Sequence, residues 1–193
     1  MRERCDMTKA EHRASIAKHA AEAFKDHVLT NEGDGRWLCS KPGTGIYHFR
    51  IIFSPGCVFM YGDIYDLCLM CYDHDSLQWL RTAPHLDYVM GKSTKPSRVF
   101  LPAEAEAYLQ RTEADEEDNR RGIVGKIREA WEDNQMEDDR VEPAMAWRFA
   151  YVDATGDTEP PACDDWDEQM LYQWHGLQKF VALYEQQQQK EAA

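Results

Sequence analysis

Four polar residues in one aromatic segment are the first candidates for a binding or reactive site. His48 and Arg50 alternate with apolar side chains along residues 46–53, which we expect to form a strand. Asp63 and Asp66 follow around an expected turn. An imidazole, a guanidinium and two carboxylates on one sheet face could line a small-ligand pocket or perform acid–base chemistry. The simpler interpretation is a satisfied polar network on the open face of an antiparallel sheet.

Carboxylates from the most charged part of the chain form the second candidate site. A calcium-binding EF-hand loop needs acids at alternate positions, a central glycine and a terminal glutamate, and this pattern is missing. Two interpretations remain: a solvated helix face, or a surface that imitates DNA phosphates and binds a basic cleft. The residues are Glu113, Asp115, Glu116, Glu117, Asp118, Glu137, Asp138 and Asp139.

The sequence predicts no metal, no cofactor and no catalytic residue. Cys68-x-x-Cys71 supplies two thiols, but a structural zinc site needs four ligands, and no second pair has suitable spacing. These cysteines are therefore expected to pack in the core. Phosphate-binding glycine loops and the common hydrolase and protease motifs are also missing from the sequence. Taken together, these missing motifs favour a protein without catalytic activity.

The composition indicates a folded, acidic protein of the cell interior. Hydrophobic residues make up 43% of the 193 residues and aromatic residues 11%, which suffices for a core. The formal net charge of −13 argues against direct nucleic-acid binding and leaves a basic partner protein as an option. Neither a secretory signal nor an apolar run of about 20 residues is visible, so no membrane association is expected. The six cysteines are expected to be reduced.

A small sheet must position the first candidate site. Aromatic runs joined by Pro-Gly and Gly-Asp turns predict an antiparallel meander over about residues 37–72, with Tyr47, Phe49, Ile51 and Phe53 on one face. We predict one α+β domain in which this meander packs against N- and C-terminal helices. The domain begins with an N-terminal helix in 1–35, followed by the sheet and two short helices in 36–95. An acidic helical region follows in 97–140, with its helices over 102–140. The domain ends with a C-terminal helical region and a frayed tail in 141–193.

The helical parts of the chain carry less specific signals. The first helix is expected from Lys9 to about Leu29, and residues 101–135 form either two helices or one long helix. Residues 143–152 fit a helix or an edge strand. The last helix is expected to start from Asp164 or Asp165 as its cap. Its apolar face is expected to consist of Trp166, Met170, Trp174, Leu177, Val181 and Tyr184.

Four short motifs resemble a family of uncharacterised accessory proteins of tailed bacteriophages. The pattern W-x-C-x-x-P-G-T-x-I-Y-x-F-R spans Trp37 to Arg50, and P-G-x-x-x-x-x-G-D spans Pro55 to Asp63. S-L-x-W-L and D-Y-V-x-x-K follow at Ser76 and Asp87. The resemblance covers about residues 35–95 and, loosely, the last 40. It implies a viral origin and the cytoplasm of an infected bacterium, and it brings no catalytic residues with it.

Three functions are compatible with these features. The leading hypothesis is a non-enzymatic phage protein that binds and inhibits a host factor, such as a component of antiviral defence, through the acidic surface. The second is a protein that binds or cleaves a small ligand, such as a nucleotide signal, on the polar face of the sheet. The third is a structural or assembly protein of the virion. The sequence sets neither the partner nor the oligomeric state.

Overall fold

The computed structural model describes residues 7–72, 75–83, 85–114, 118–137 and 142–192. These residues divide into two compact units. Unit 1 comprises residues 7–12 and 98–165, and unit 2 comprises residues 13–97 and 166–192. The elements are α1 (Lys9–Phe24), β1 (Val28–Gly33), β2 (Arg36–Ser40), β3 (Phe49–Ser54), β4 (Cys57–Gly62), β5 (Leu67–Met70), α2 (Ser76–Thr82), α3 (Leu86–Met90), β6 (Arg98–Phe100), α4 (Pro102–Ala114), α5 (Asp118–Glu137), α6 (Pro143–Thr155), β7 (Asp164–Trp166) and α7 (Glu168–Glu191).

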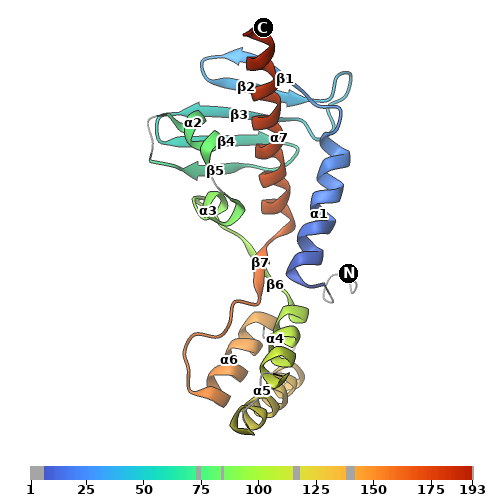
Figure 1. Cartoon of the computed structure of the whole chain (residues 1–193), viewed down its shortest axis with the longest axis vertical. Helices are drawn as coiled ribbons and strands as arrows, with labels where there is room; N and C mark the ends of the chain where they lie inside the picture. Colours follow the sequence, from blue (N-terminus) through green and yellow to red (C-terminus); the bar gives the residue numbers. More distant parts are fainter. Residues whose placement is uncertain (1–6, 73–74, 84, 115–117, 138–141, 193) are drawn as a thin grey trace. The chain divides into compact units, whose positions relative to one another are not determined.

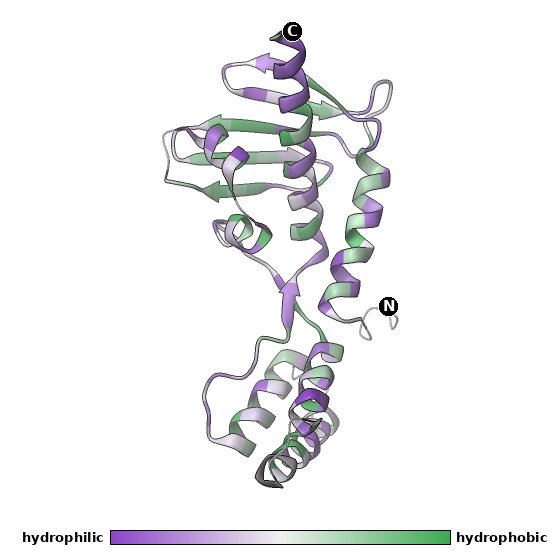
Figure 2. Ribbon diagram, viewed as in Figure 1, coloured by the Kyte–Doolittle hydropathy of each residue, from purple (hydrophilic) through white to green (hydrophobic). Residues whose placement is uncertain are grey.

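Unit 2 is built on a five-stranded antiparallel meander in the order β1-β2-β3-β4-β5 (Figure 1). The register places Trp37, Ile51, Met60 and Leu67 in one row across four strands. All four side chains are buried, because alternate residues of a strand point to the same face. Hydrophobic colouring is accordingly concentrated on β3, β4 and β5 (Figure 2). This row forms the floor of the core of unit 2.

Helices α1 and α7 cover the buried face of the sheet. Phe24 of α1 packs edge-on against Phe49, and Phe180 of α7 contacts Trp37 and Phe53. Gly176 allows α7 to approach closely, because a Cβ atom there would lie 2.7 Å from Cδ1 of Ile64. The sheet and the two helices thus share one hydrophobic cluster.

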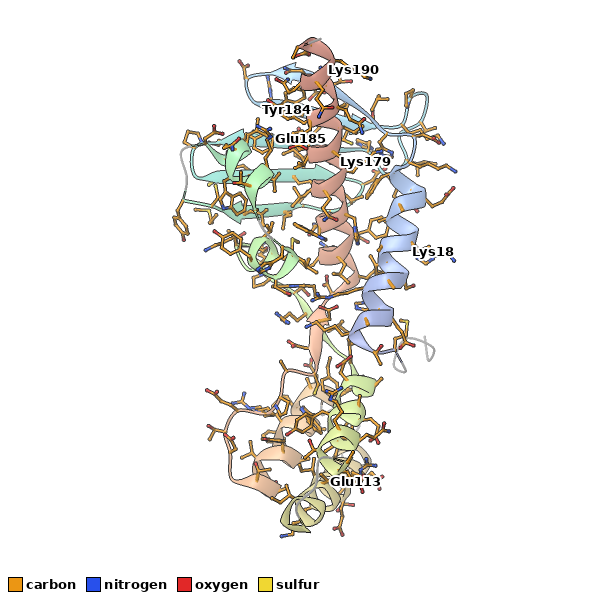
Figure 3. The ribbon with its side chains drawn as sticks, viewed as in Figure 1. Lys18, Glu113, Lys179, Tyr184, Glu185 and Lys190 are labelled. Carbon is orange, nitrogen blue, oxygen red and sulfur yellow. The ribbon has the colours of Figure 1, made fainter. Side chains whose placement is uncertain are left out.

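The C-terminal half of α7 is also fastened to α2. Tyr184 and Glu185 lie next to each other on this helix (Figure 3). The guanidinium carbon of Arg81 lies 5.5 Å from the centre of the Tyr184 ring, and its Nε lies 3.6 Å from Oε1 of Glu185. These contacts hold α2 beside the last helix.

Unit 1 consists mainly of the helices α4, α5 and α6 around a separate aromatic core. Trp131 of α5 and Trp147 of α6 meet edge-on with ring centres 5.2 Å apart, and Tyr108 of α4 adds a third ring. Leu109 and Ile127 complete the buried centre. Among the described residues, no helix of either unit is long and apolar enough to span a membrane.

Formal charge is distributed very unevenly between the units. Residues 98–165 contain 19 acidic and 8 basic residues, a net charge of −11. The segments of unit 2, 13–97 and 166–193, contain 13 acidic and 11 basic residues, a net charge of −2. Nearly all of the acidity of the chain therefore belongs to unit 1.

The structure confirms the predicted α+β fold with a meander flanked by the N- and C-terminal helices. The first helix, however, ends at Phe24, and residues 28–33 form the edge strand β1. Strand β3 begins at Phe49 rather than Ile46, because Tyr47 has a left-handed φ of 58° that interrupts extended backbone. Residues 143–155 are helical, and the described part of residues 102–137 forms two helices. The prediction of a single domain stays a prediction.

The boundaries of the last helix also differ from the prediction. Asp167 is the N-cap of α7, whereas Asp164 and Asp165 belong to strand β7, which pairs with β6. The polar tail continues the helix to Glu191 instead of fraying. The buried face of α7 is rotated as well, since Gln173, Gly176 and Phe180 lie on it.

Candidate functional site

A pocket of about 660 Å³ lies in unit 2, a size typical of small-ligand sites. Strands β3, β4 and β5 form one side of it, and the first two turns of α7 and the segment 93–97 form the rest. Backbone hydrogen bonds fix this segment: Thr94 donates to the carbonyl of Cys68 at 3.0 Å, and Asp167 donates to the carbonyl of Ser97 at 3.2 Å. The frame of the pocket is therefore held by main-chain bonds.

The apolar part of the pocket comes from the open face of the sheet. Phe59 and Tyr61 of β4 point away from the core, because Val58 and Met60 between them are buried on the other face. Each of the two aromatic side chains is 39% exposed. Ile52 of β3 lies opposite Phe59 in the register and adds an aliphatic surface. Together they offer a flat apolar wall to a ligand.

The most unusual polar group in the wall is the side-chain amide of Gln173. This residue is fully buried on α7, and its Nε2 donates to the main-chain carbonyl of Asp66 at 3.1 Å. Its Oε1 is also buried and has no hydrogen-bond partner among the described residues. A buried acceptor without a donor costs about 1–3 kcal/mol of stability.

Charged groups surround the pocket unequally. Asp66 and Asp167 both line it, and the only cation among the described lining residues is Lys95. The Asp167 carboxylate caps α7, since its Oδ1 accepts the Met170 amide at 2.8 Å. The Lys95 ammonium has no ion pair within the described part of the chain. Hydroxyl groups of Ser93, Thr94 and Ser97 add neutral polar atoms.

The four polar residues predicted from the sheet do not converge. His48 pairs with Asp63, with Nδ1 3.2 Å from Oδ2, and the same nitrogen lies 2.6 Å from the Gly45 carbonyl. Arg50 forms a two-pronged bond with Glu32, at 3.0 Å from Nε to Oε2 and 3.1 Å from Nη2 to Oε1. Asp66 is the member of the predicted set that lines the pocket. The side chains of the other three form ion pairs at the surface.

The predicted acidic surface is described only in part. Glu113 lies on α4 (Figure 3), and its Oε2 is 3.6 Å from Nη2 of Arg128, which lies closer still to Glu106 at 2.8 Å. Asp118 and Glu137 are the end residues of α5, and their side chains are not described. Asp115, Glu116, Glu117, Asp138 and Asp139 lie outside the described residues. Within the described residues, no group of three His, Cys, Asp or Glu side chains could hold a metal ion.

Sequence reasoning missed the residues that build the pocket wall. Gln173 stands between Met170 and Leu177 on the buried face of α7, so a polar residue interrupting an apolar stripe was the available signal. The sequence identifies Phe59 as an aromatic residue of an expected strand. The face of the sheet on which its side chain lies, however, depends on the register of the strands.

No protein-family model, no curated protein and no solved structure matches this chain. What the pocket binds must therefore follow from its own chemistry.

Proposed function

We propose that this protein is a non-enzymatic binding protein and that unit 2 holds a small molecule in the pocket lined by strands β3 to β5, the segment 93–97 and the start of α7. The observation that carries this proposal is the pocket of about 660 Å³ itself, with the exposed aromatic side chains of Phe59 and Tyr61 in its lining. The apolar wall and the backbone frame of the pocket give a bound molecule contact area and a fixed position. Rigid strands and a long helix supply the wall and the frame.

The pocket residues favour binding over catalysis. The carboxylate of Asp167 already serves as a helix cap, and the amide of Gln173 neither gains nor loses protons near neutral pH. The described lining also contains no imidazole. These groups orient a ligand rather than transfer its protons.

A ligand screen followed by nuclear magnetic resonance tests this function directly. The side-chain amide signals of Gln173 should shift when a pocket ligand is added, while those of Gln110, an exposed residue of α4 in unit 1, should stay in place. Native mass spectrometry of the purified protein would reveal a molecule carried from the cell. If a diverse metabolite library leaves the Gln173 signals unchanged, the proposal is wrong.

A second candidate function concerns unit 1 and follows from its net charge of −11. In this proposal the protein is an accessory protein of a tailed bacteriophage that acts in the cytoplasm of the infected cell. It binds a basic host protein, such as a component of antiviral defence, and inhibits it. Met145 and Phe149, one turn apart on α6, are 49% and 45% exposed and supply an apolar contact within the acidic unit.

Affinity purification from infected host lysate at low and high salt tests the second function. The triple variant Glu129→Lys, Glu132→Lys and Asp133→Lys reverses exposed charges of α5 and should lose both the partner and most of the salt dependence. Asp34→Lys, at an exposed turn of unit 2, is the matched control and should retain the partner. Equal capture by the triple variant and the wild type would rule out the electrostatic interface.

A further inference from the structure

We infer that unit 2 binds a soft monovalent cation, Cu(I), between the thiolate of Cys57 and the thioether of Met70, with the side chain of Cys68 beside them. The site lies on strands β4 and β5, which are neighbours in the sheet (Figure 1). It goes beyond the proposed function, because neither Cys57 nor Met70 lines the pocket and the site needs no pocket ligand. Three features support it: two sulfur atoms in direct contact, a third sulfur atom on the same face, and ligand types that suit soft metals.

The two sulfur atoms in contact belong to residues that face each other across the sheet. Cys57 begins β4, Met70 ends β5, and the antiparallel register pairs them directly. The thiol of Cys57 donates a hydrogen bond to Sδ of Met70, and the two sulfur atoms are 3.5 Å apart. With metal–sulfur bonds of about 2.3 Å, as in zinc thiolates, one cation can bond to sulfur atoms up to about 4.6 Å apart. A metal ion can therefore replace the thiol proton without a shift of the strands.

A third sulfur atom lies on the same face of the sheet. Cys68 precedes Met70 by two residues, so the two side chains point to the same side of β5. Cys68 is also the diagonal neighbour of Cys57 on the adjacent strand, a position that is typically about 7–8 Å away between Cα atoms. All three residues are partly exposed, so an ion can reach them from solvent. Cys71, by contrast, is buried in the core of unit 2.

The surroundings of Cys57 disfavour a bare thiolate. Burial raises the pKa of its thiol, and the neighbouring Cys68 and Cys71 raise this pKa further. A bound Cu(I) takes the place of the thiol proton, which passes to solvent. The thiolate and the cation then neutralise each other, and a neutral pair is less costly than a single charge at a half-buried position. The thiol therefore stays protonated until a cation that binds sulfur displaces the proton.

The types of ligand favour Cu(I) over harder ions. Thiolate and thioether sulfur are soft ligands, and soft ligands select Cu(I). Structural zinc takes four ligands from thiolates, imidazoles and carboxylates, and the thioether of Met70 does not belong to this set. Calcium and magnesium bind oxygen ligands. Cys57 and Met70 thus offer a site for which a soft monovalent ion is the best match.

An anaerobic titration of the full chain with Cu(I), in competition with the coloured chelator bicinchoninate, tests the inference. The wild type should withdraw Cu(I) from the chelator. Loss of a residue that only supports a metal ligand costs about 10- to 100-fold in affinity, so Cys57→Ser, which removes a ligand, should weaken binding by at least about 100-fold. Met70→Leu nearly conserves side-chain volume and should weaken binding by about tenfold or more. Cys163→Ala removes a thiol of unit 1 and is the control that should bind like the wild type.

A measurement on the wild type alone avoids variants that fail to fold. Ag(I) is a soft monovalent probe, and one equivalent should protect Cys57 from N-ethylmaleimide, because a metal-bound thiolate is no longer free to attack the reagent. Peptide mass spectrometry reads the extent of alkylation at each cysteine. Zn(II) at the same concentration should leave Cys57 reactive.

The contrary outcomes address separate parts of the inference. If Met70→Leu binds Cu(I) as tightly as the wild type, the pair of ligands is wrong. Equal protection of Cys57 by Zn(II) would contradict the soft-metal class. If Ag(I) leaves Cys57 as reactive as before, unit 2 does not contain the site. None of these results bears on the pocket ligand, which the Gln173 signals test independently.

Discussion

At the scale of single residues, His27 shows how burial fixes a protonation state. The ring lies between Phe24 and Phe49, and 3% of the residue is exposed. Its Nε2 is 3.0 Å from the Tyr47 carbonyl and must donate, because a carbonyl oxygen can only accept. Nδ1 is then a bare, buried acceptor without a partner among the described residues. Burial lowers the pKa of His27 below 6.5, and nearby Lys179 and Lys41 lower it further against the opposing Tyr47 bond and Asp26.

This environment predicts a loss of stability in mild acid. Above pH 6.5 the imidazole is neutral in both the folded and the unfolded chain, so stability is fully present. As the pH falls below 6.5 the unfolded chain takes up a proton that folded His27 resists, and the free energy of unfolding of unit 2 decreases. His175 of α7 acts in the same direction, because burial lowers its pKa too.

Urea unfolding at pH 7.5 and 5.5, together with a histidine titration by nuclear magnetic resonance, checks this expectation. The wild type should be less stable at pH 5.5 by up to about 1.4 kcal/mol for each histidine whose folded-state pKa is lowered. His27→Gln should show a smaller pH dependence, with the remainder due to His175. Equal stability of the wild type at both pH values would contradict the assignment.

At the scale of elements, the packing of α7 depends on Gly176. A side chain at this position would meet Ile64 at 2.7 Å and the Phe49 ring at 3.6 Å, and both of these residues are buried. Glycine normally weakens a helix by about 1 kcal/mol relative to alanine, so its presence here reflects the need for close approach to the sheet.

Replacement of glycine should therefore have opposite effects on stability in α7 and in α5. Gly176→Val should destabilise unit 2 by about 1–3 kcal/mol through overpacking, and Gly176→Ala should cost less because its helix propensity offsets part of the clash. Gly125→Ala in α5 meets nothing within 4 Å and should stabilise unit 1 by up to about 1 kcal/mol. Chemical denaturation followed by circular dichroism measures both. A stabilised Gly176→Val variant would show that α7 does not pack closely on the sheet.

The elements also show what a sequence can and cannot reveal. The central strands β3 and β4 were predictable, because one face is buried and side chains such as Phe49 and Ile51 alternate with more exposed ones. Strand β1 was not, since most of its residues are exposed and its place comes from backbone pairing with β2. Likewise Gln173 contacts Asp66 across 107 positions of the chain, a distance over which local patterns carry no information.

At the scale of the whole molecule, the described residues form two hydrophobic clusters that have no residue in common. One joins the sheet with α1 and α7, and the other joins α4, α5 and α6. Each contains a buried cysteine: Cys39 in unit 2 and Cys163 in unit 1. Burial raises the pKa of Cys39 to about 12 and that of Cys163 to about 11, so both thiols resist alkylation while their unit is folded.

These two thiols report on the unfolding of each unit within one sample. In Trp147→Ala the core of unit 1 loses a large buried ring, which should cost about 3–5 kcal/mol. Cys163 should then react with iodoacetamide at a lower urea concentration than Cys39, as read by peptide mass spectrometry at pH 8. Ile51→Ala removes packing from the sheet of unit 2, costs about 2–5 kcal/mol and should reverse the order. Should both thiols become reactive at a single urea concentration in each variant, the units unfold together, and the single domain predicted from the sequence would be the correct description of the molecule.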